Sequence, residues 1–284
     1  MLRRVEFPTL LPSSYSLRLG WDVDFEHGYA HNGSLRMYYE VHGQARPGRT
    51  PLALIHGGGS TIESNFRELI PLLIGTRQVI AVEEEGHGHT APIDRPLTAE
   101  NSAADVAAVL RQLDVPLADV LGFSAGGHTA LALAMEHPAV VRKLIIASSM
   151  AARDGMVEGF WDGLQNATSA DMPEVYREAD LKLNPDQQHL ERLFVLDSQR
   201  MLTFPGWTDE QLGSITASTL VVLADRDVIK PEHGVQMVRA IPGSRLMIVP
   251  GNHGDYLGEQ AASDGDLRTM RATLPFLLRH LDEA

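Results

Sequence analysis

The sequence predicts an α/β protein with a central, mostly parallel sheet and helices on both faces of that sheet. Short, continuous apolar runs, typical of buried parallel strands, alternate with segments whose apolar residues recur at helical spacing. The alternation stops near residue 151 and resumes near residue 214, and the stretch between holds helical patterns without a buried strand. We therefore expect an α/β core of residues 1–150 and 214–284, interrupted by a helical insert of residues 151–213.

The N-terminal part of the core is expected to begin with a β-hairpin. Residues 1–24 show no regular period and are assigned to no element. Residues 29–43 place an Asn32-Gly33 turn beside a run of strand-forming residues, which predicts the hairpin. Thr98 is a plausible N-cap for one of the helices that follow. The alternation then predicts strands within 51–59, 77–90, 118–123 and 142–150, and helices within 61–74, 98–114 and 126–137.

The insert and the C-terminal part of the core follow the same rules of spacing. Within the insert, residues 172–183 and 189–204 are amphipathic at helical spacing. The core then resumes, with strands expected within 218–229 and 244–254 and helices within 231–243 and 266–281.

Composition excludes several classes of function. The 37 acidic residues exceed the 24 Lys and Arg residues and give a formal net charge of −13, which disfavours nucleic acid and membrane surfaces as partners. The chain has no cysteine, so disulfides, thiolate zinc sites, iron–sulfur clusters and cysteine nucleophiles are excluded. No apolar stretch approaches the roughly 20 residues that span a bilayer. Pro8 and Pro12 interrupt the first apolar run, which makes a poor signal peptide and favours a cytoplasmic location.

A serine at the junction of an expected strand and helix is the strongest functional signal. Gly122-Phe123-Ser124-Ala125-Gly126 fits the pattern G-x-S-x-G, with a strand before it and a helix after it. Such a sharp bend exposes the serine and requires small residues two positions away on either side. The alternative is an ordinary structural turn. In its strand–helix context the pattern favours Ser124 as a nucleophile.

The base that would activate this serine should be a histidine after a later strand. His253 directly follows the last expected strand, whereas His56 and His128 adjoin the glycine loop and the serine bend, and are expected either to support those loops or to face solvent. His87 and His89 form an H-x-H pair, but this spacing within a turn is weak evidence for metal, and we expect no metal site. His233 begins a helix after Pro231 and is expected to be exposed.

The acid that would orient His253 should come from an earlier strand end. Asp225 belongs to the end of the strand within 218–229, whereas Asp227 lies beyond it and can reach back over the sheet edge. We therefore favour Asp227. The preceding strand offers only Ser148 and Ser149 at the equivalent place. The chain order is then Ser, Asp, His.

Backbone amides should receive the oxyanion that forms on attack. One is the amide of Ala125 at the start of the helix, where the helix dipole also helps. The second should come from the glycine loop His56-Gly57-Gly58-Gly59, with Gly58 as the best donor and Gly59 as the next. A phosphate-binding loop is the alternative, but neither G-x-x-x-x-G-K-[ST] nor G-x-G-x-x-G is present.

Together these motifs resemble the α/β-hydrolase superfamily, over the core from about Phe25 to the C-terminus. The matching positions are Ser124 in GFSAGG, Asp227 in ADRD, His253 in GNHGD and Gly58 in HGGG, and the insert lies where the family carries its cap, or lid. One turn departs from the family pattern D-x-R-G-H-G-x-S, because Glu83 and Glu85 stand where Asp and Arg are usual. The serine nucleophile is unlike the aspartate of haloalkane dehalogenases and epoxide hydrolases.

The resemblance implies a serine hydrolase that cleaves a small or medium carboxylic ester, or a related acyl compound, without a cofactor. The substrate would lie between core and insert, beside some of the aromatic residues Phe123, Phe160, Trp161, Phe204 and Trp207. The glycine loop is also similar to that of the carbon–carbon bond hydrolases of aromatic degradation, which are the first alternative. Others are a receptor that keeps the pocket and turns over slowly, and a transferase or peroxidase-like enzyme that uses the same serine. The oligomeric state is left open.

Overall fold

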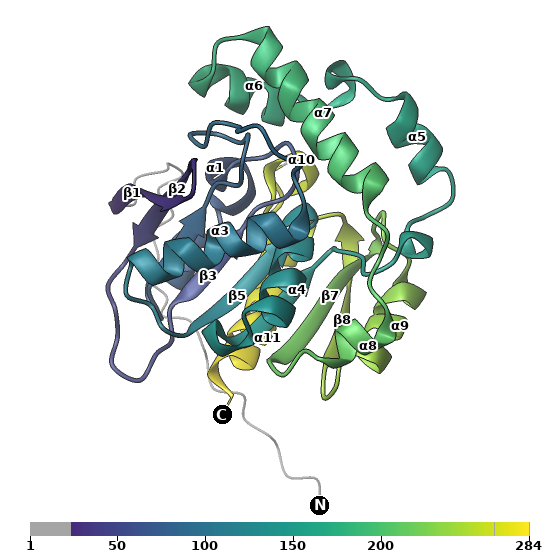
Figure 1. Cartoon of the computed structure of the whole chain (residues 1–284). Coiled ribbons are helices and arrows are strands. Elements are labelled where there is room, and N and C mark those ends of the chain that lie inside the picture. The colour runs from purple at the N-terminus through teal and green to yellow at the C-terminus, as the bar shows by residue number, and fades with distance from the viewer. Residues whose placement is uncertain (1–23, 264, 284) are drawn as a thin grey trace, which may run out of the picture.

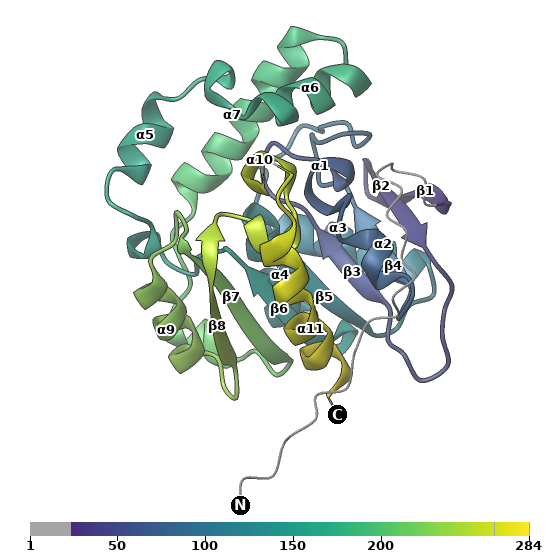
Figure 2. The same ribbon diagram turned by 180° about the vertical axis from the view of Figure 1, so that it is seen from behind.

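Eight strands form one sheet in the order β1-β2-β4-β3-β5-β6-β7-β8 (Figures 1 and 2). The structure is a computed structural model that describes residues 24–263 and 265–283, so the unassigned residues 1–23 lie outside it. The strands are β1 (Phe25–Asn32), β2 (Leu35–His42), β3 (Leu52–Ile55), β4 (Val79–Val82), β5 (Ala118–Phe123), β6 (Val141–Ala147), β7 (Ser218–Arg226) and β8 (Arg245–Asn252).

The sheet is parallel from β4 to β8, and of the two strands of the N-terminal hairpin only β2 runs against the others. β1 pairs antiparallel with β2, and β2 pairs antiparallel with β4. The hairpin turn consists of Gly33 and Ser34, one residue later than expected, because Asn32 still pairs with Leu35. Gly33 has a φ of 59°, which glycine adopts without strain.

Helices cover both faces of the sheet, as the sequence predicted. The helices are α1 (Ile62–Phe66), α2 (Ile70–Leu73), α3 (Ala99–Gln112), α4 (Ala125–Glu136), α5 (Phe160–Asn166), α6 (Glu174–Leu183), α7 (Gln187–Thr203), α8 (Asp209–Gly213), α9 (Pro231–Ala240), α10 (Gln260–Ser263) and α11 (Arg268–Asp282). α3, α4, α8 and α9 lie on the face seen in Figure 1, and α1, α2 and α11 on the face seen in Figure 2.

Alternate residues of the inner strands supply the two halves of the core. On β3, Ala53 and Ile55 pack with the helices of one face, while Leu52 and Leu54 pack with those of the other. A strand buried on both sides has no polar face, which is why these runs are continuously apolar. The predicted fold class is confirmed.

One expected helix differs in detail. The single helix expected within 61–74 is two short helices, α1 and α2, and Pro71 stands in the first turn of α2, where its missing N–H costs nothing. Thr61 caps α1, and Thr98 caps α3 as expected, since its side chain accepts from the amide of Asn101 at 3.2 Å.

The insert places three of its helices over the carboxyl ends of the parallel strands. Figures 1 and 2 show α5, α6 and α7 on that side of the sheet. α8 also falls within 151–213, but it packs beside α4 and α9 on a face of the sheet. Among the described residues, no helix is both long enough and apolar enough to span a membrane.

Candidate active site

Ser124 occupies a strained bend between β5 and α4. Its φ of 52° and ψ of −118° lie in a region that side-chain-bearing residues rarely adopt. The bend is held by the Ser124 amide, which donates to the carbonyl of Ala147 at 2.9 Å. The flanking glycines are required by space, because a Cβ on Gly122 would lie 2.2 Å from the carbonyl oxygen of Gly126.

Replacing Gly126 with alanine is expected to destabilise the fold by about 1–3 kcal/mol, the usual cost of overpacking. A Cβ at this position would lie 2.3 Å from the backbone oxygen of His56, which cannot rotate away. Thermal or urea unfolding measures the effect. Gly163→Ala in α5 is the matched control, because no atom lies within 4 Å of its added Cβ, and this variant should be at least as stable as the wild type. Equal stability of the two variants would contradict the expectation.

Three side chains from three strand ends meet beside this bend. His253, in the loop after β8, places Nε2 3.0 Å from the Ser124 hydroxyl oxygen and Nδ1 2.7 Å from Oδ1 of Asp227. The ring of Phe123 lies against the imidazole, with centroids 4.9 Å apart. The arrangement lets Nε2 accept a proton from the hydroxyl while Nδ1–H donates to the carboxylate.

Asp227 is held by four donors. Besides His253, its carboxylate accepts from the hydroxyl of Ser148, the amide of Ala224 at 3.2 Å and the amide of Ile229 at 3.4 Å. Burial raises the pKa of Asp227, but the hydrogen bonds with His253 and Ser148 outweigh it and leave the pKa below its ordinary value. Asp227 is therefore ionised at neutral pH.

The groups that support Asp227, Ser148 and Tyr256, were not predicted from the sequence. The Ser148 hydroxyl lies 2.8 Å from the hydroxyl of Tyr256, which also donates to the carbonyl of Val222 at 3.1 Å. Both residues are buried, with 1% and 0% of their surface exposed. The alternative acid, Asp225, is engaged elsewhere and accepts from the amide of Gly251 at 2.9 Å.

In the glycine loop, Gly58 lines the cavity beside Ser124, and its amide differs from those of its two glycine neighbours. The Gly57 amide donates to the side chain of Asn65 at 2.6 Å, and the Gly59 amide donates to the carboxylate of Asp197 at 2.6 Å. Within the described residues the Gly58 amide makes no hydrogen bond. The expectation that Gly59 could serve as the second-choice oxyanion donor is therefore corrected, because the Gly59 N–H already donates to the charged side chain of Asp197. Ala125, the other expected donor, is the first residue of α4.

A cavity of about 290 Å³ opens at Ser124 and His253. Its walls come from the glycine loop, the bend, the His253 loop and the insert. The lining residues are Gly57, Gly58, Phe123, Ser124, Pro173, Tyr176, Asn252, His253, Glu259, Ala261 and Ala262. Phe123 is thus the one aromatic residue among those expected at the substrate that lies at this cavity.

The four aromatic residues expected from the insert pack elsewhere. The Phe160 and Trp161 rings pack edge to face, and the Trp161 indole donates to the carbonyl of Arg153 at 3.0 Å. Phe204 stacks on the buried ring of His128 and packs against Trp207. These side chains hold the insert on the core, so the cavity wall from the insert is Pro173 and Tyr176 instead.

Two other histidines considered from the sequence, His56 and His233, have structural partners. His56 supports the glycine loop, since Nδ1–H donates to the carbonyl of Gly57 at 2.8 Å and Nε2 accepts from the amide of Glu84 at 3.0 Å. His233 is buried, contrary to expectation, because its Nε2 accepts from the amide of Ala151 at 2.9 Å. Across the described residues, no group of three or more His, Asp or Glu side chains could hold a metal ion.

Comparison with known proteins places this geometry in a family. The family model described as alpha/beta hydrolase fold matches residues 50–201. The chain is 30% identical over 237 residues to the putative carbamate hydrolase RutD of Azorhizobium caulinodans, covering 77% of this chain and 88% of that one. It is 32% identical over 234 residues to a pimeloyl-[acyl-carrier protein] methyl ester esterase of Neisseria meningitidis, covering 74% and 88%.

A solved structure shows the same fold. The 2-hydroxy-6-oxo-6-phenylhexa-2,4-dienoate hydrolase of Rhodococcus sp. strain RHA1 superposes with a TM-score of 0.73, covering 92% of this chain and 100% of that one, at 17% sequence identity. Because the family model matches over half of the chain and the curated relatives cover about three quarters of it, this protein belongs to the α/β-hydrolase family.

Proposed function

We propose that this protein is a serine hydrolase that cleaves a small or medium carboxylic ester, or a related acyl compound, through an acyl-enzyme. One observation carries the proposal: His253 lies within hydrogen-bond distance of both Ser124 and Asp227, at 3.0 and 2.7 Å. A serine hydroxyl becomes a nucleophile when an oriented base takes its proton. The hydrolase activities of the curated relatives agree with this reaction class.

In the first half of the reaction, the Ser124 oxygen attacks the substrate carbonyl carbon while its proton passes to Nε2 of His253. The Asp227 carboxylate keeps the imidazole in the required tautomer and stabilises its charged form. The negative charge that develops on the carbonyl oxygen is received by the amides of Ala125 and Gly58. The imidazolium then protonates the leaving group, which departs and leaves an ester on Ser124.

In the second half, His253 takes a proton from water, which attacks the acyl-enzyme. The tetrahedral intermediate again uses the two amides, and collapse returns the proton to Ser124 and releases the acid. The chain supplies the first nucleophile, the base and the oxyanion donors, and water supplies the second nucleophile, so the steps written here use no cofactor.

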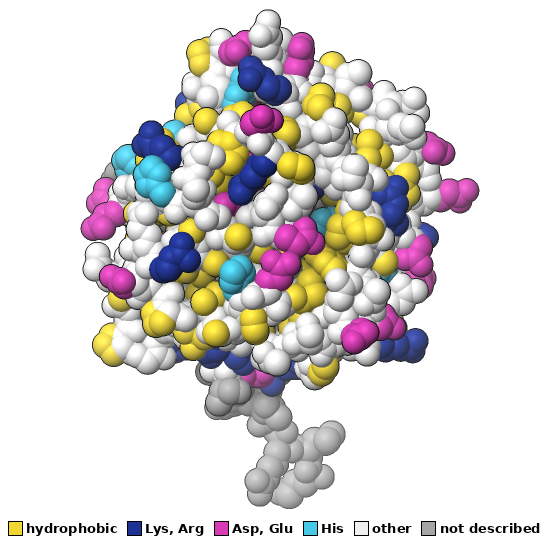
Figure 3. Space-filling model, in the orientation of Figure 1, with side chains coloured by type: hydrophobic (Ala, Val, Ile, Leu, Met, Phe, Trp, Pro, Cys, Tyr) yellow, Lys and Arg dark blue, Asp and Glu magenta, His cyan; other side chains and the backbone are white. Residues whose placement is uncertain are grey.

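The cavity supports a small substrate with apolar character and some polar groups. A volume of about 290 Å³ lies near the lower end of the range for small-molecule sites. Phe123, Pro173 and Ala262 give it apolar walls, and Tyr176 and Glu259 add polar groups. The face seen in Figure 3 carries Lys and Arg side chains scattered among acidic ones, and no Lys or Arg is among the described residues that line the cavity, which favours a small molecule over a polyanion.

A fluorophosphonate probe followed by p-nitrophenyl esters of increasing chain length tests the proposal. We expect covalent labelling on Ser124, found by mass spectrometry, and turnover that falls as the acyl chain outgrows the cavity. Labelling without turnover of any ester would favour a receptor. Labelling with poor ester turnover would favour carbon–carbon bond cleavage. No labelling would overturn the proposed nucleophile.

A further inference from the structure

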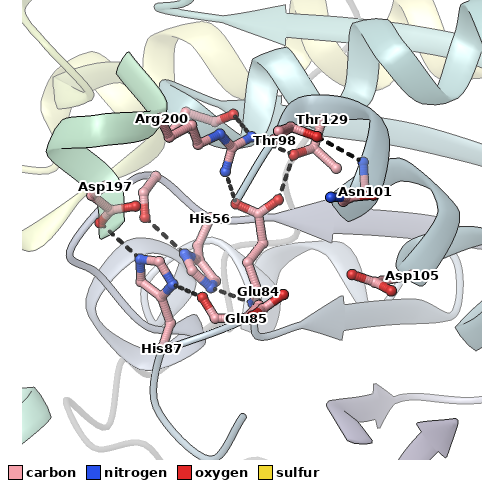
Figure 4. Close-up of polar contacts among 12 residues, drawn as sticks. His56, Glu84, Glu85, His87, Thr98, Asn101, Asp105, Thr129, Asp197 and Arg200 are labelled. Atoms are coloured by element: carbon pink, nitrogen blue, oxygen red, sulfur yellow. Dashed lines mark hydrogen bonds and ion pairs between the residues drawn. The ribbon is translucent and has the colours of Figure 1, made fainter. Parts of the chain in front are cut away.

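The helix α7 of the insert sends two charged side chains into the core beside the proposed oxyanion hole (Figure 4). Asp197 and Arg200 are three residues apart and lie on the same side of the helix. Oδ2 of Asp197 accepts from the amide of Gly59 at 2.6 Å and lies 3.0 Å from Nε2 of His87. A Cβ placed on Gly58 would lie only 3.2 Å from that same oxygen. The Asp197 carboxylate is therefore an immediate neighbour of the proposed donor.

Arg200 makes the equivalent contact on the other side of the oxyanion hole. Its guanidinium donates to the carbonyl of Ala125 at 2.9 Å, to the Thr129 hydroxyl at 2.7 Å and to the Glu84 carboxylate at 2.8 Å. The Thr129 hydroxyl also donates to Glu84. Arg200 and Glu84 are buried, at 4% and 0% exposed. α7 therefore contacts the backbone at both proposed oxyanion donors: Arg200 binds Ala125 itself, and Asp197 binds Gly59, which follows Gly58.

His87 has the hydrogen-bonding pattern of an imidazolium. Its Nδ1 lies 3.0 Å from the carbonyl oxygen of Glu85 and its Nε2 lies 3.0 Å from the Asp197 carboxylate, so both nitrogens face acceptors. The Gly59 amide is also 3.1 Å from Nε2, but it is closer to the carboxylate, which is the better acceptor. Burial lowers the pKa of His87, yet the attraction of Asp197 outweighs it and raises the pKa to about 9.

The charge of His87 has a consequence for the reaction. An unpaired carboxylate beside Gly58 would repel the oxyanion that the Gly58 amide receives, and the repulsion would be strong in a water-excluded site. The His87 imidazolium neutralises this carboxylate, as Arg200 neutralises Glu84 on the other side. The two pairs hold the backbone of the oxyanion hole without leaving net negative charge beside it.

We propose that Asp197, His87 and Arg200 are positioning residues that couple the docking of α7 to the oxyanion hole, and that the His87 charge offsets Asp197 during the reaction. This inference rests on the proposed function, because it assigns a task to the amides of Gly58 and Ala125. The insert then helps to complete the oxyanion hole in addition to covering the cavity.

The inference predicts a pH dependence. The charged and titratable groups around His87 are Asp197 from α7, Glu84 from the same turn, His56 from the glycine loop and Asp180 from α6. The pKa of His87 is raised above its ordinary 6.5 to about 9. The contribution of the His87 charge to the stability of the folded protein is therefore complete below about pH 6.5 and is lost as the pH rises through 9. We expect kcat to fall above about pH 9, and this limb to be absent in Asp197→Asn.

Three variants separate charge from structure. His87→Gln keeps an amide donor for Asp197 but removes the positive charge, and it should lower kcat on p-nitrophenyl butyrate by about 10–100-fold, somewhat less than loss of a whole oxyanion donor. KM should stay within about threefold. Asp197→Asn/His87→Gln removes both charges and should recover most of the loss. If the pair served packing alone, the double variant would be no better than His87→Gln, and that result would overturn the inference.

A matched control is available on the surface of the insert. Glu174 and Arg177 of α6 form an exposed ion pair at 2.8 Å, and neither residue contacts Asp197, His87 or Arg200 through a hydrogen bond or ion pair. Glu174→Gln removes one charge from the insert, as Asp197→Asn does, and should leave kcat and its pH profile unchanged. A similar loss in this control would show that insert charge in general, and not the Asp197–His87 pair, sets the rate.

A transition-state analogue tests directly how well the oxyanion hole stabilises a negative charge. An alkyl trifluoromethyl ketone adds the Ser124 oxygen to its carbonyl carbon while the serine proton passes to His253, which leaves a hemiketal oxyanion in the hole. In ¹⁹F NMR titrations we expect the pKa of this hemiketal hydroxyl to be higher in His87→Gln than in the wild type by about one unit, a tenfold change in the ionisation constant. The double variant should return toward the wild-type value.

The outcomes distinguish this inference from the proposed function. A wild-type protein that forms no hemiketal would overturn the proposed function and this inference together. A wild-type hemiketal with an unchanged pKa in His87→Gln would overturn this inference alone. If His87→Gln fails to fold, the pH profiles of the wild type and Asp197→Asn decide, because an alkaline limb shared by both would exclude His87 as its source.

Discussion

Replacing Ser124 with alanine is expected to lower kcat/KM for a p-nitrophenyl ester by about 10⁴–10⁶-fold. The variant removes the oxygen that lies 3.0 Å from Nε2 of His253 and leaves the amides of the proposed oxyanion hole in place. Residual rate over the uncatalysed reaction would then come from those amides and from binding alone. Steady-state kinetics measures the loss, and mass spectrometry should show that the fluorophosphonate adduct disappears.

A second serine provides the control for this variant. Ser149 is 1% exposed, and its hydroxyl has no hydrogen-bond partner among the described residues. Ser149→Ala removes the same hydroxyl group without touching His253, so turnover should stay within a few-fold of the wild type. Alanine meets the same backbone strain at position 124 as serine does, so the melting temperature of Ser124→Ala should change little. An active Ser124→Ala variant would show that another group attacks the substrate.

The meeting of Ser124, Asp227 and His253 was predictable because of a rule of sheet geometry. The carboxyl ends of parallel strands share one edge, so polar residues that directly follow strands are brought together there. β5, β7 and β8 each end beside one of these residues. The neighbours of the three residues were harder to foresee, because Ser148 and Tyr256 carry no pattern of their own until the fold places them against Asp227.

The packing of the insert was not predictable from its aromatic content. Large apolar side chains serve equally well in a cavity wall or in a packed interface, and the four aromatics expected at the substrate lie in the interface. A better signal was present in α7. Leu190, Leu193, Asp197 and Arg200 lie along one helical face, the first two apolar and almost fully buried. Two charges that continue a buried face indicate partners in the core.

The three successive glutamates after β4 are a second place where the structure differs from what a local sequence pattern predicts. A run of like charges usually faces solvent, yet Glu83, Glu84 and Glu85 are 2%, 0% and 0% exposed. Each has its own partner: Glu83 pairs with His89, Glu85 with Arg95 ten residues away, and Glu84 with Arg200 from α7. Burial of charge without such partners would be costly, and pairing across the fold cannot be read from a local pattern.

Replacing Asp227 with asparagine is expected to lower kcat by about 10⁴-fold, the second large effect. Oδ2 of Asp227 accepts from Ser148 and from the amide of Ala224, while Oδ1 faces Nδ1 of His253. Oδ2 has two donors, Ser148 and the closer amide, that of Ala224 at 3.2 Å, whereas the Ile229 amide lies 3.4 Å from Oδ1, so the oxygen of an asparagine is expected to replace Oδ2 and its NH₂ group to face His253. Nδ1 would then have to accept, which places the proton of the neutral ring on Nε2, where it cannot receive the Ser124 proton. The pH profile of kcat, measured on a p-nitrophenyl ester, reports this change.

Asp225→Asn is the matched control, because it makes the same chemical change two residues away. Asp225 is exposed and accepts from the Gly251 amide, so its variant should keep turnover within a few-fold of the wild type. The contrast is informative because both variants remove one negative charge from the same end of β7, and long-range electrostatics would affect them alike. Asp227 differs from Asp225 in its contact with His253 and in its burial against Ser148 and the amides of Ala224 and Ile229. Comparable activity of the two variants would therefore mean that His253 needs no carboxylate partner, and that its tautomer is set by another group.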